Sequence, residues 1–289
     1  MNREIECWQP VHWPAIWAMA LLWFFTGCAV SPKKEAQDLP RVIAFYTAEN
    51  DRAHISFVHE ANRWFERMGR EYKFAYDSTS NWDLLNEDHL RNYQLVVFLD
   101  TRPETSDQRS AFEQYMKNGG AWMGFHFSAF ALTPSAFPQN WDWYHNEFLG
   151  SGQYQSNTWR PTSARLKVEA PDHPVARQLP ALITSSPNEW YRWQNNLRED
   201  PAIRALLSID PSSFPLGTGP KPHEIWHSGD YPVVWTNMQY RMIYFNMGHN
   251  DIDYEGGTNR ELSFTFGNPE QDRLVRNAIL WLTGIHENR

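Results

Sequence analysis

Between residues 41 and 125, apolar strand-like runs alternate with amphipathic stretches, and this alternation restricts the fold more than any other feature of the sequence. The first run, RVIAFYTA, is followed by AHISFVHEANRWFERMG, whose apolar residues have helical spacing. Alternation of this kind predicts an α/β fold, with a mostly parallel sheet and helices on both faces. The later strand-like runs are YKFAYD, YQLVVFLDT and AWMGFH, separated by the helical stretches WDLLNEDHLRN and RSAFEQYMKN.

The second half of the chain is less regular. From Trp141 to Asp230 the sequence is rich in Trp, Pro and Asn, and only SARLKVEA and AIRALLSI predict strands. Long insertions of this kind usually form a rim or lid over the strand ends, and we expect that arrangement here. Regular patterns return with YPVVWTN and RMIYFNMGHN, an expected strand pair, and with a final helix capped by Asn268 and ended by Gly284.

Polar side chains follow several of the predicted strands. In an open parallel sheet, ligands bind beyond the carboxyl ends of the strands. We therefore expect the side chains at these ends to converge on one site, where those after the first and third strands bind substrate. The residues are Asp51, Arg52 and His54 after the first strand, Asp100 and Arg102 after the third, and His126 after the fourth.

Three residues are the candidate catalytic groups. His126 lies at the tip of GGAWMGFHFSAF, where a tight strand-to-helix turn would project its side chain into the crevice. Glu189 lies among aromatic residues in SPNEWYRW, and Gly248 in NMGHND allows a tight turn that directs His249 to the same place. Two histidines and a carboxylate can bind a divalent metal with an open position, or they can divide acid and base roles. The sequence leaves both alternatives open.

The amino terminus predicts export. The apolar run in WPAIWAMALLWFFTGC is shorter than the roughly 20 residues of a membrane span, and it fits the roughly 7–15 residues of a secretory signal. FTGC resembles a bacterial lipobox, which makes Cys28 the lipidated residue. We therefore expect a lipoprotein signal peptide at residues 1–28, a tether at 29–40 and one domain at 41–286. The mature protein would be lipid-anchored in the cell envelope, periplasmic or at the outer membrane in a Gram-negative cell.

Cysteine content and charge exclude several classes of function. The only cysteines are Cys7, inside the predicted signal, and Cys28. The mature domain would therefore have no cysteine nucleophile, no disulfide and no thiolate metal site. The net charge is −8, and an acidic chain without a basic run is a poor candidate for nucleic-acid binding.

The motifs GGAWMGFHFSAF, DHPVARQLP, NEWYRW and YPVVWTNMQYRMIYFNMGHND, read in this order, resemble the ThuA-like (trehalose utilisation) family. The resemblance covers about residues 41–284. It implies a flavodoxin-like sheet related to the class I glutamine amidotransferases, with His126 at the position of their cysteine nucleophile and hence no glutaminase activity. It also places His126, Glu189 and His249 in the family's cavity, beside Trp190, Tyr191 and Trp235. Asn188 stands where an aspartate commonly precedes the glutamate.

The resemblance further implies a role in carbohydrate metabolism, on disaccharides, glycosides or 3-keto sugars. His126 and His249 would exchange protons with the substrate, Glu189 would orient one of them, and Trp190 and Trp235 would form an apolar wall. Hydrolysis, elimination or isomerisation would fit such a site, and no cofactor is demanded beyond an optional divalent metal. One alternative is a non-catalytic carbohydrate-binding lipoprotein, and another is a partner-binding surface protein.

Overall fold

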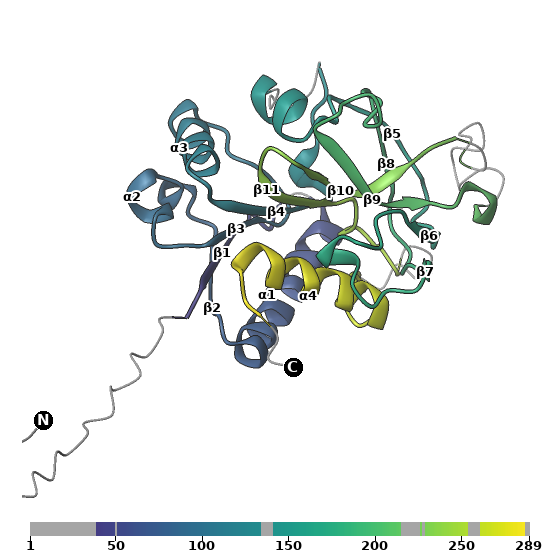
Figure 1. Ribbon diagram of the computed structural model, residues 1–289, viewed down its shortest axis with the longest axis horizontal. Coiled ribbons are helices and arrows are strands. Elements are labelled where there is room, and N and C mark those ends of the chain that lie inside the picture. The colour runs from purple at the N-terminus through teal and green to yellow at the C-terminus, as the bar shows by residue number, and fades with distance from the viewer. Residues whose placement is uncertain are drawn as a thin grey trace, which may run out of the picture. The chain divides into compact units, whose positions relative to one another are not determined.

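The computed structural model describes residues 39–49, 51–133, 141–214, 226, 229–253 and 261–286. Within them, nine strands form one sheet in the order β2-β1-β3-β4-β11-β10-β9-β6-β7 (Figure 1). The predicted signal peptide and nearly all of the predicted tether lie outside the described residues. No helix in the described ranges is long and apolar enough to cross a bilayer.

The first five strands of this order are parallel to one another. Four of them come from the alternating region of the sequence, as predicted, and the fifth comes from late in the chain. β3 and β4 are buried along their whole length, because helices cover both faces of the sheet. The strands are β1 (Arg41–Phe45), β2 (Ala75–Thr79), β3 (Leu95–Phe98), β4 (Ala121–Phe125) and β11 (Arg241–Phe245).

The remaining strands are antiparallel. The pair β10 and β11 confirms the expected strand pair, but the expectation for residues 141–230 was incomplete. We expected this stretch to form a rim or lid, but part of it adds strands to the main sheet. Another part forms a separate two-stranded sheet. The main-sheet strands are β10 (Pro232–Asn237), β9 (Ile203–Ile209), β6 (Arg165–Val168) and β7 (Leu182–Thr184), and the small sheet holds β5 (Tyr154–Asn157) and β8 (Tyr191–Trp193).

Helices lie on both faces of the sheet (Figure 1). On one face α1 (Arg52–Tyr72) and α4 (Pro269–Thr283) belong to the apolar cluster that contains Val42 and Ala44 of β1. On the other face α2 (Glu87–Leu90) and α3 (Ser106–Lys117) pack in the cluster that contains Ile43 and Phe45. Short helical turns complete the described elements: η1 (Trp82–Leu84), η2 (His126–Ala129), η3 (Trp143–Phe148), η4 (Pro174–Ala176) and η5 (Pro211–Ser213).

Side-chain caps fix where the helices begin. The Asp51 carboxylate accepts hydrogen bonds from the backbone amides of Ala53 and His54, and so caps α1 directly after β1. Asn268 caps α4 in the same way, and Gly284 ends that helix in the left-handed conformation, as predicted. The cap at Asp51 places the first turn of α1 at the carboxyl end of the sheet, which is the end expected to hold the site.

Candidate active site

The turn after β4 holds His126 in an unusual backbone conformation. His126 has a φ of 38°, in the left-handed region that side chains other than glycine seldom adopt. The Tyr244 hydroxyl donates a hydrogen bond of 2.8 Å to the His126 carbonyl and fixes the turn. The imidazole is 1 % exposed. Strained residues of this kind persist only where the surrounding structure holds them, and they cluster at functional sites.

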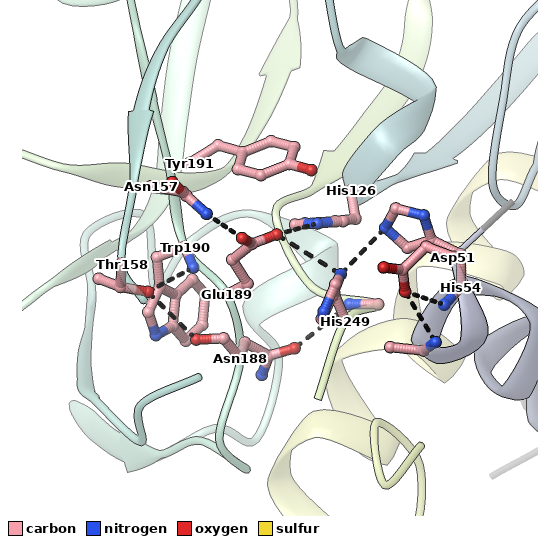
Figure 2. Close-up of polar contacts among 12 residues, drawn as sticks. Asp51, His54, His126, Asn157, Thr158, Asn188, Glu189, Trp190, Tyr191 and His249 are labelled. Atoms are coloured by element: carbon pink, nitrogen blue, oxygen red, sulfur yellow. Dashed lines mark hydrogen bonds and ion pairs between the residues drawn. The ribbon is translucent and has the colours of Figure 1, made fainter. Parts of the chain in front are cut away.

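His126, Glu189 and His249 lie together (Figure 2). The Glu189 Oε2 atom is 3.3 Å from His126 Nε2 and 3.4 Å from His249 Nδ1. The segments that carry Glu189 and His249 are joined directly, because the Glu189 amide donates to the His249 carbonyl at 2.8 Å. All three side chains are buried. One carboxylate oxygen therefore faces two imidazoles in a nearly closed site.

A third histidine, His54 in the first turn of α1, completes the cluster. Its Nε2 atom lies 3.1 Å from His249 Nδ1. Each of His54, His126 and His249 offers one ring nitrogen, and these nitrogens all lie within 4.8 Å of one another. In a tetrahedral site with metal–nitrogen bonds of about 2.0–2.1 Å, neighbouring ligand atoms lie roughly 3.3 Å apart. The 3.1 Å separation of His54 Nε2 and His249 Nδ1 is close to this spacing, so the three histidines offer a candidate site for a small divalent ion of the zinc type.

The protonation of the three histidines also suits a metal. Burial, and after it the neighbouring His249, lower the pKa of His54 to about 4, although Asp51 and Glu189 partly oppose them. Burial is also the main cause that lowers the pKa of His126 and of His249, although Glu189 partly opposes it at His249. The imidazoles are thus neutral at pH 7, and the neutral ring is the form that accepts a proton or binds a metal.

The Glu189 carboxylate is held from behind. The Asn157 side-chain amide donates to Glu189 Oε1, and the Tyr154 hydroxyl donates to Asn157 Oδ1 at 2.7 Å. Since an amide nitrogen can only donate, this contact fixes which carboxylate oxygen points to the histidines. Asn157 and Tyr154 belong to β5, in the stretch where the sequence pattern is irregular, and nothing in that pattern singled them out.

The turn that carries His249 depends on Gly248 and Asn188. Gly248 has a φ of 135°, as a tight turn at this position requires. Its amide donates to Asn188 Oδ1 at 3.2 Å. Asn188 is fully buried and supports the turn from the residue beside Glu189.

The aromatic residues predicted around the site divide into two groups. The Tyr191 ring lies on the His126 ring, with centroids 3.9 Å apart. The indoles of Trp190 and Trp235 are 0 % exposed, and their Nε1 atoms donate to the carbonyls of Thr162 and Leu149. These two indoles form part of the core rather than the expected apolar wall, because aromatic content alone does not show which face a ring occupies.

The polar residues after β1 and β3 support the site in different ways. Asp51 caps α1, and Asp100 accepts from the Thr47 and Ala48 amides at 2.8 and 2.7 Å. Arg102 is buried and donates through Nη1 to the Phe127 carbonyl at 3.2 Å; burial lowers its pKa to about 9. Arg52 is exposed on α1. Of the residues predicted after the first and third strands, the structure brings His54 into the histidine cluster, and substrate binding by Asp51, Arg52, Asp100 and Arg102 stays a prediction.

Comparison with known proteins agrees with the fold. A thuA-like protein from Bacteroides uniformis is 33% identical, with a TM-score of 0.73, over 87% of this chain and 95% of its own. A thuA-like protein from Parabacteroides merdae, 19% identical with a TM-score of 0.58, matches over 88% and 93%. A β-galactosidase from Rahnella sp. R3, 10% identical with a TM-score of 0.51, matches over 86% of this chain and 32% of its own, and shares the fold alone.

No curated protein matches the chain. The family model for ThuA, described as trehalose utilisation, matches residues 41–282, which is most of the sequence. The match covers β1 through α4 and includes every residue of the histidine cluster. The chain therefore belongs to the ThuA family, a family of carbohydrate utilisation.

Proposed function

We propose that this protein is a metal-assisted enzyme that acts on a sugar or glycoside at the cluster of His54, His126, His249 and Glu189. The observation that carries this proposal is the convergence of three neutral histidines and one carboxylate beyond the carboxyl ends of β1, β4 and β11. Ligands bind at this end of open α/β sheets. The family description supports a carbohydrate as the substrate.

In this proposal the three histidines hold the ion and Glu189 moves the proton. Three protein ligands leave a coordination position open to substrate, as in catalytic zinc sites. When bound, the ion would polarise a carbonyl or hydroxyl oxygen of the sugar as a Lewis acid. Glu189 is suited to proton transfer because Asn157 holds one of its oxygens and leaves the other facing the histidines.

A keto sugar suits this arrangement, because its carbonyl acidifies the neighbouring C–H bond. Glu189 Oε2 would accept that proton, and the electron pair of the broken C–H bond would form the enolate. Delivery of the proton to the former carbonyl carbon gives isomerisation, with the hydroxyl proton of the deprotonated carbon passing to the former carbonyl oxygen and a new carbonyl forming at the deprotonated carbon. Loss of a group from the carbon beyond gives elimination, with the proton passing to the leaving oxygen. Neither route needs a covalent nucleophile, and the described part of the domain contains no cysteine.

The metal part of the proposal is tested by elemental analysis of the purified domain. We expect about one zinc-type ion per chain in the wild type and a loss of most of it in His54→Ala, because one of three ligands is removed. His59→Ala is the matched control, since His59 is exposed five residues further along the same helix. A metal-free wild type that turns over sugars and loses activity in His126→Ala would instead assign proton transfer to the histidines.

The catalytic part is tested with Glu189→Gln. We expect turnover of glycosides or keto sugars to fall at least about 100-fold, because general acid–base catalysis contributes roughly 10²–10⁴-fold. Metal content should stay unchanged, and the exposed Glu261→Gln should behave like the wild type. Sugar binding without any product, in the wild type and Glu189→Gln alike, would instead show a carbohydrate-binding protein.

We also propose that the protein is exported and anchored in the cell envelope through a lipid on Cys28. The support is the short apolar run followed by FTGC. Metabolic labelling with a radioactive fatty acid should mark the wild type in the membrane fraction. Cys28→Ala should remove the label and release the protein from that fraction, and a labelled Cys28→Ala would refute the assignment.

A further inference from the structure

A strip of three aromatic rings leads away from the histidine cluster. The Phe127 ring lies 5.0 Å from the His54 ring, measured between centroids. Phe130 stacks on Phe127 at 4.7 Å with an interplanar angle of 13°, and Tyr154 follows at 5.0 Å from Phe130. These contacts form a continuous row of rings that begins at the candidate active site.

The strip differs from the aromatic residues beneath it. Phe127, Phe130 and Tyr154 are each partly exposed, whereas Tyr191, which Tyr154 contacts edge to face at 5.1 Å, is buried. Partly exposed aromatic residues such as Tyr240 also lie elsewhere at the edge of this core, and what distinguishes the strip is that it begins at the His54 ring. Ligand sites are lined mainly by apolar and aromatic side chains with a few polar groups, and the strip supplies such rings beside the histidine cluster.

We infer that Phe127, Phe130 and Tyr154 form a subsite for the second ring of a two-ring glycoside, whose first ring lies at the histidine cluster. The inference rests on the proposed function. Sugar rings carry apolar C–H groups on their faces, and burial of these groups against aromatic rings is favourable. Since the strip starts at His54, a ring joined to the reacting sugar by one glycosidic bond reaches it.

A second observation connects the strip to the reacting group. Tyr154 contributes its ring to the strip, while its hydroxyl holds Asn157, which in turn holds Glu189. A second sugar ring against the strip would therefore contact Tyr154, whose hydrogen bond to Asn157 leads to the Glu189 carboxylate. Phe130 contacts the Tyr154 ring but contributes no hydrogen bond to this series, so its replacement tests the strip while leaving the hydrogen-bonding groups in place.

The test measures the affinity of the full mature domain for trehalose and glucose, each also in its 3-keto form, by isothermal titration calorimetry. We expect the wild type to bind the two-ring sugar more tightly than the one-ring sugar. Phe130→Ala should weaken two-ring binding roughly three- to tenfold and leave one-ring binding unchanged. The control is Tyr240→Ala, a partly exposed aromatic at the β10–β11 turn, at the opposite end of the sheet.

The outcomes separate the subsite from the proposed function. A Phe130→Ala protein that keeps the wild-type preference for two rings would overturn the subsite and leave the proposed function standing. Equal losses for one-ring and two-ring sugars would also overturn it. A folded wild type that binds and turns over none of the four sugars would count against the proposed function itself, and the subsite would fall with it.

Discussion

At the scale of single residues, the two carboxylate oxygens of Glu189 have different contacts, and this difference determines which oxygen can react. Oε1 accepts from the Asn157 amide, and Oε2 lies near the two histidines. A carboxylate that could rotate freely would spend part of its time facing away from the reacting atoms. Hydrogen bonds to a reacting group from behind fix its orientation in the same way that outer residues orient metal ligands.

Asn157→Ala should therefore lower kcat by about 10- to 100-fold, as substitutions behind metal ligands do. The metal content should stay at the wild-type value, because the contact of Asn157 is to Glu189 Oε1 and not to the oxygen that faces the histidines. Steady-state kinetics and elemental analysis check the two expectations together. The exposed Asn196→Ala serves as the control, and wild-type kcat in Asn157→Ala would show that Glu189 needs no such support.

At the scale of elements, the connection between β1 and α1 determines where His54 lies. Asp100, directly after β3, accepts two backbone hydrogen bonds and one from the Thr47 hydroxyl, so it ties this connection to the neighbouring strand. Ala48 within the connection has a φ of 55°, a conformation that needs such support. Burial raises the pKa of Asp100, and the same hydrogen bonds oppose that rise.

Asp100→Asn should destabilise the protein by about 1–3 kcal/mol, because an amide nitrogen would face buried donors in place of a carboxylate oxygen. Metal affinity should fall as well, since α1 would lose its fixed starting point. Urea unfolding and a metal titration provide the measurements. Asp88→Asn is the control, because the Asp88 side chain forms an exposed ion pair with Arg91, and such pairs contribute about 0–1 kcal/mol.

The elements also show how far a single sequence predicts this fold. The strands and helices between residues 41 and 125 follow from periodicity, because each repeats a local pattern of strand, helix and cap. The apolar runs also predict β6 and β9 as strands, but they predict neither β7 nor the place of these three strands in the sheet, because that place depends on pairing with distant strands rather than on local pattern. For the same reason the sequence could place His126 and His249 at strand ends but could not identify Asn157, whose direction is set by the pairing of β5 with β8.

At the scale of the whole molecule, buried neutral histidines outside the cluster make stability depend on pH. Burial lowers the pKa of His145 to about 3, with Arg102 as the next cause, and burial lowers the pKa of His173 to about 4. The unfolded chain, in which histidine has a pKa of about 6.5, binds these protons more readily. Stability is therefore independent of these groups above about pH 6.5, and it decreases as the pH falls from there towards their folded pKa values.

The contribution of one group can be isolated with His145→Gln. Urea unfolding of the metal-free protein between pH 7 and pH 4 should show a smaller loss of stability in the variant than in the wild type. The difference in slope should be at most about 1.4 kcal/mol per pH unit, the value for one proton. Buried acids with raised pKa values, such as Glu60, act in the opposite direction but equally in both proteins. Parallel curves would mean that His145 does not titrate in this way.

A ribosome that has released the chain only as far as β10 would expose two half-sheets that cannot yet meet. β4 ends one of them and β10 begins the other, and β11 pairs with both. Until β11 emerges, two central strands have open edges that can pair with other chains, so a nascent chain at this stage needs protection. The residues that follow β11 directly include His249. Release of β11 and the residues after it from the ribosome therefore allows the sheet to close and the histidine cluster to form at the same late stage of synthesis.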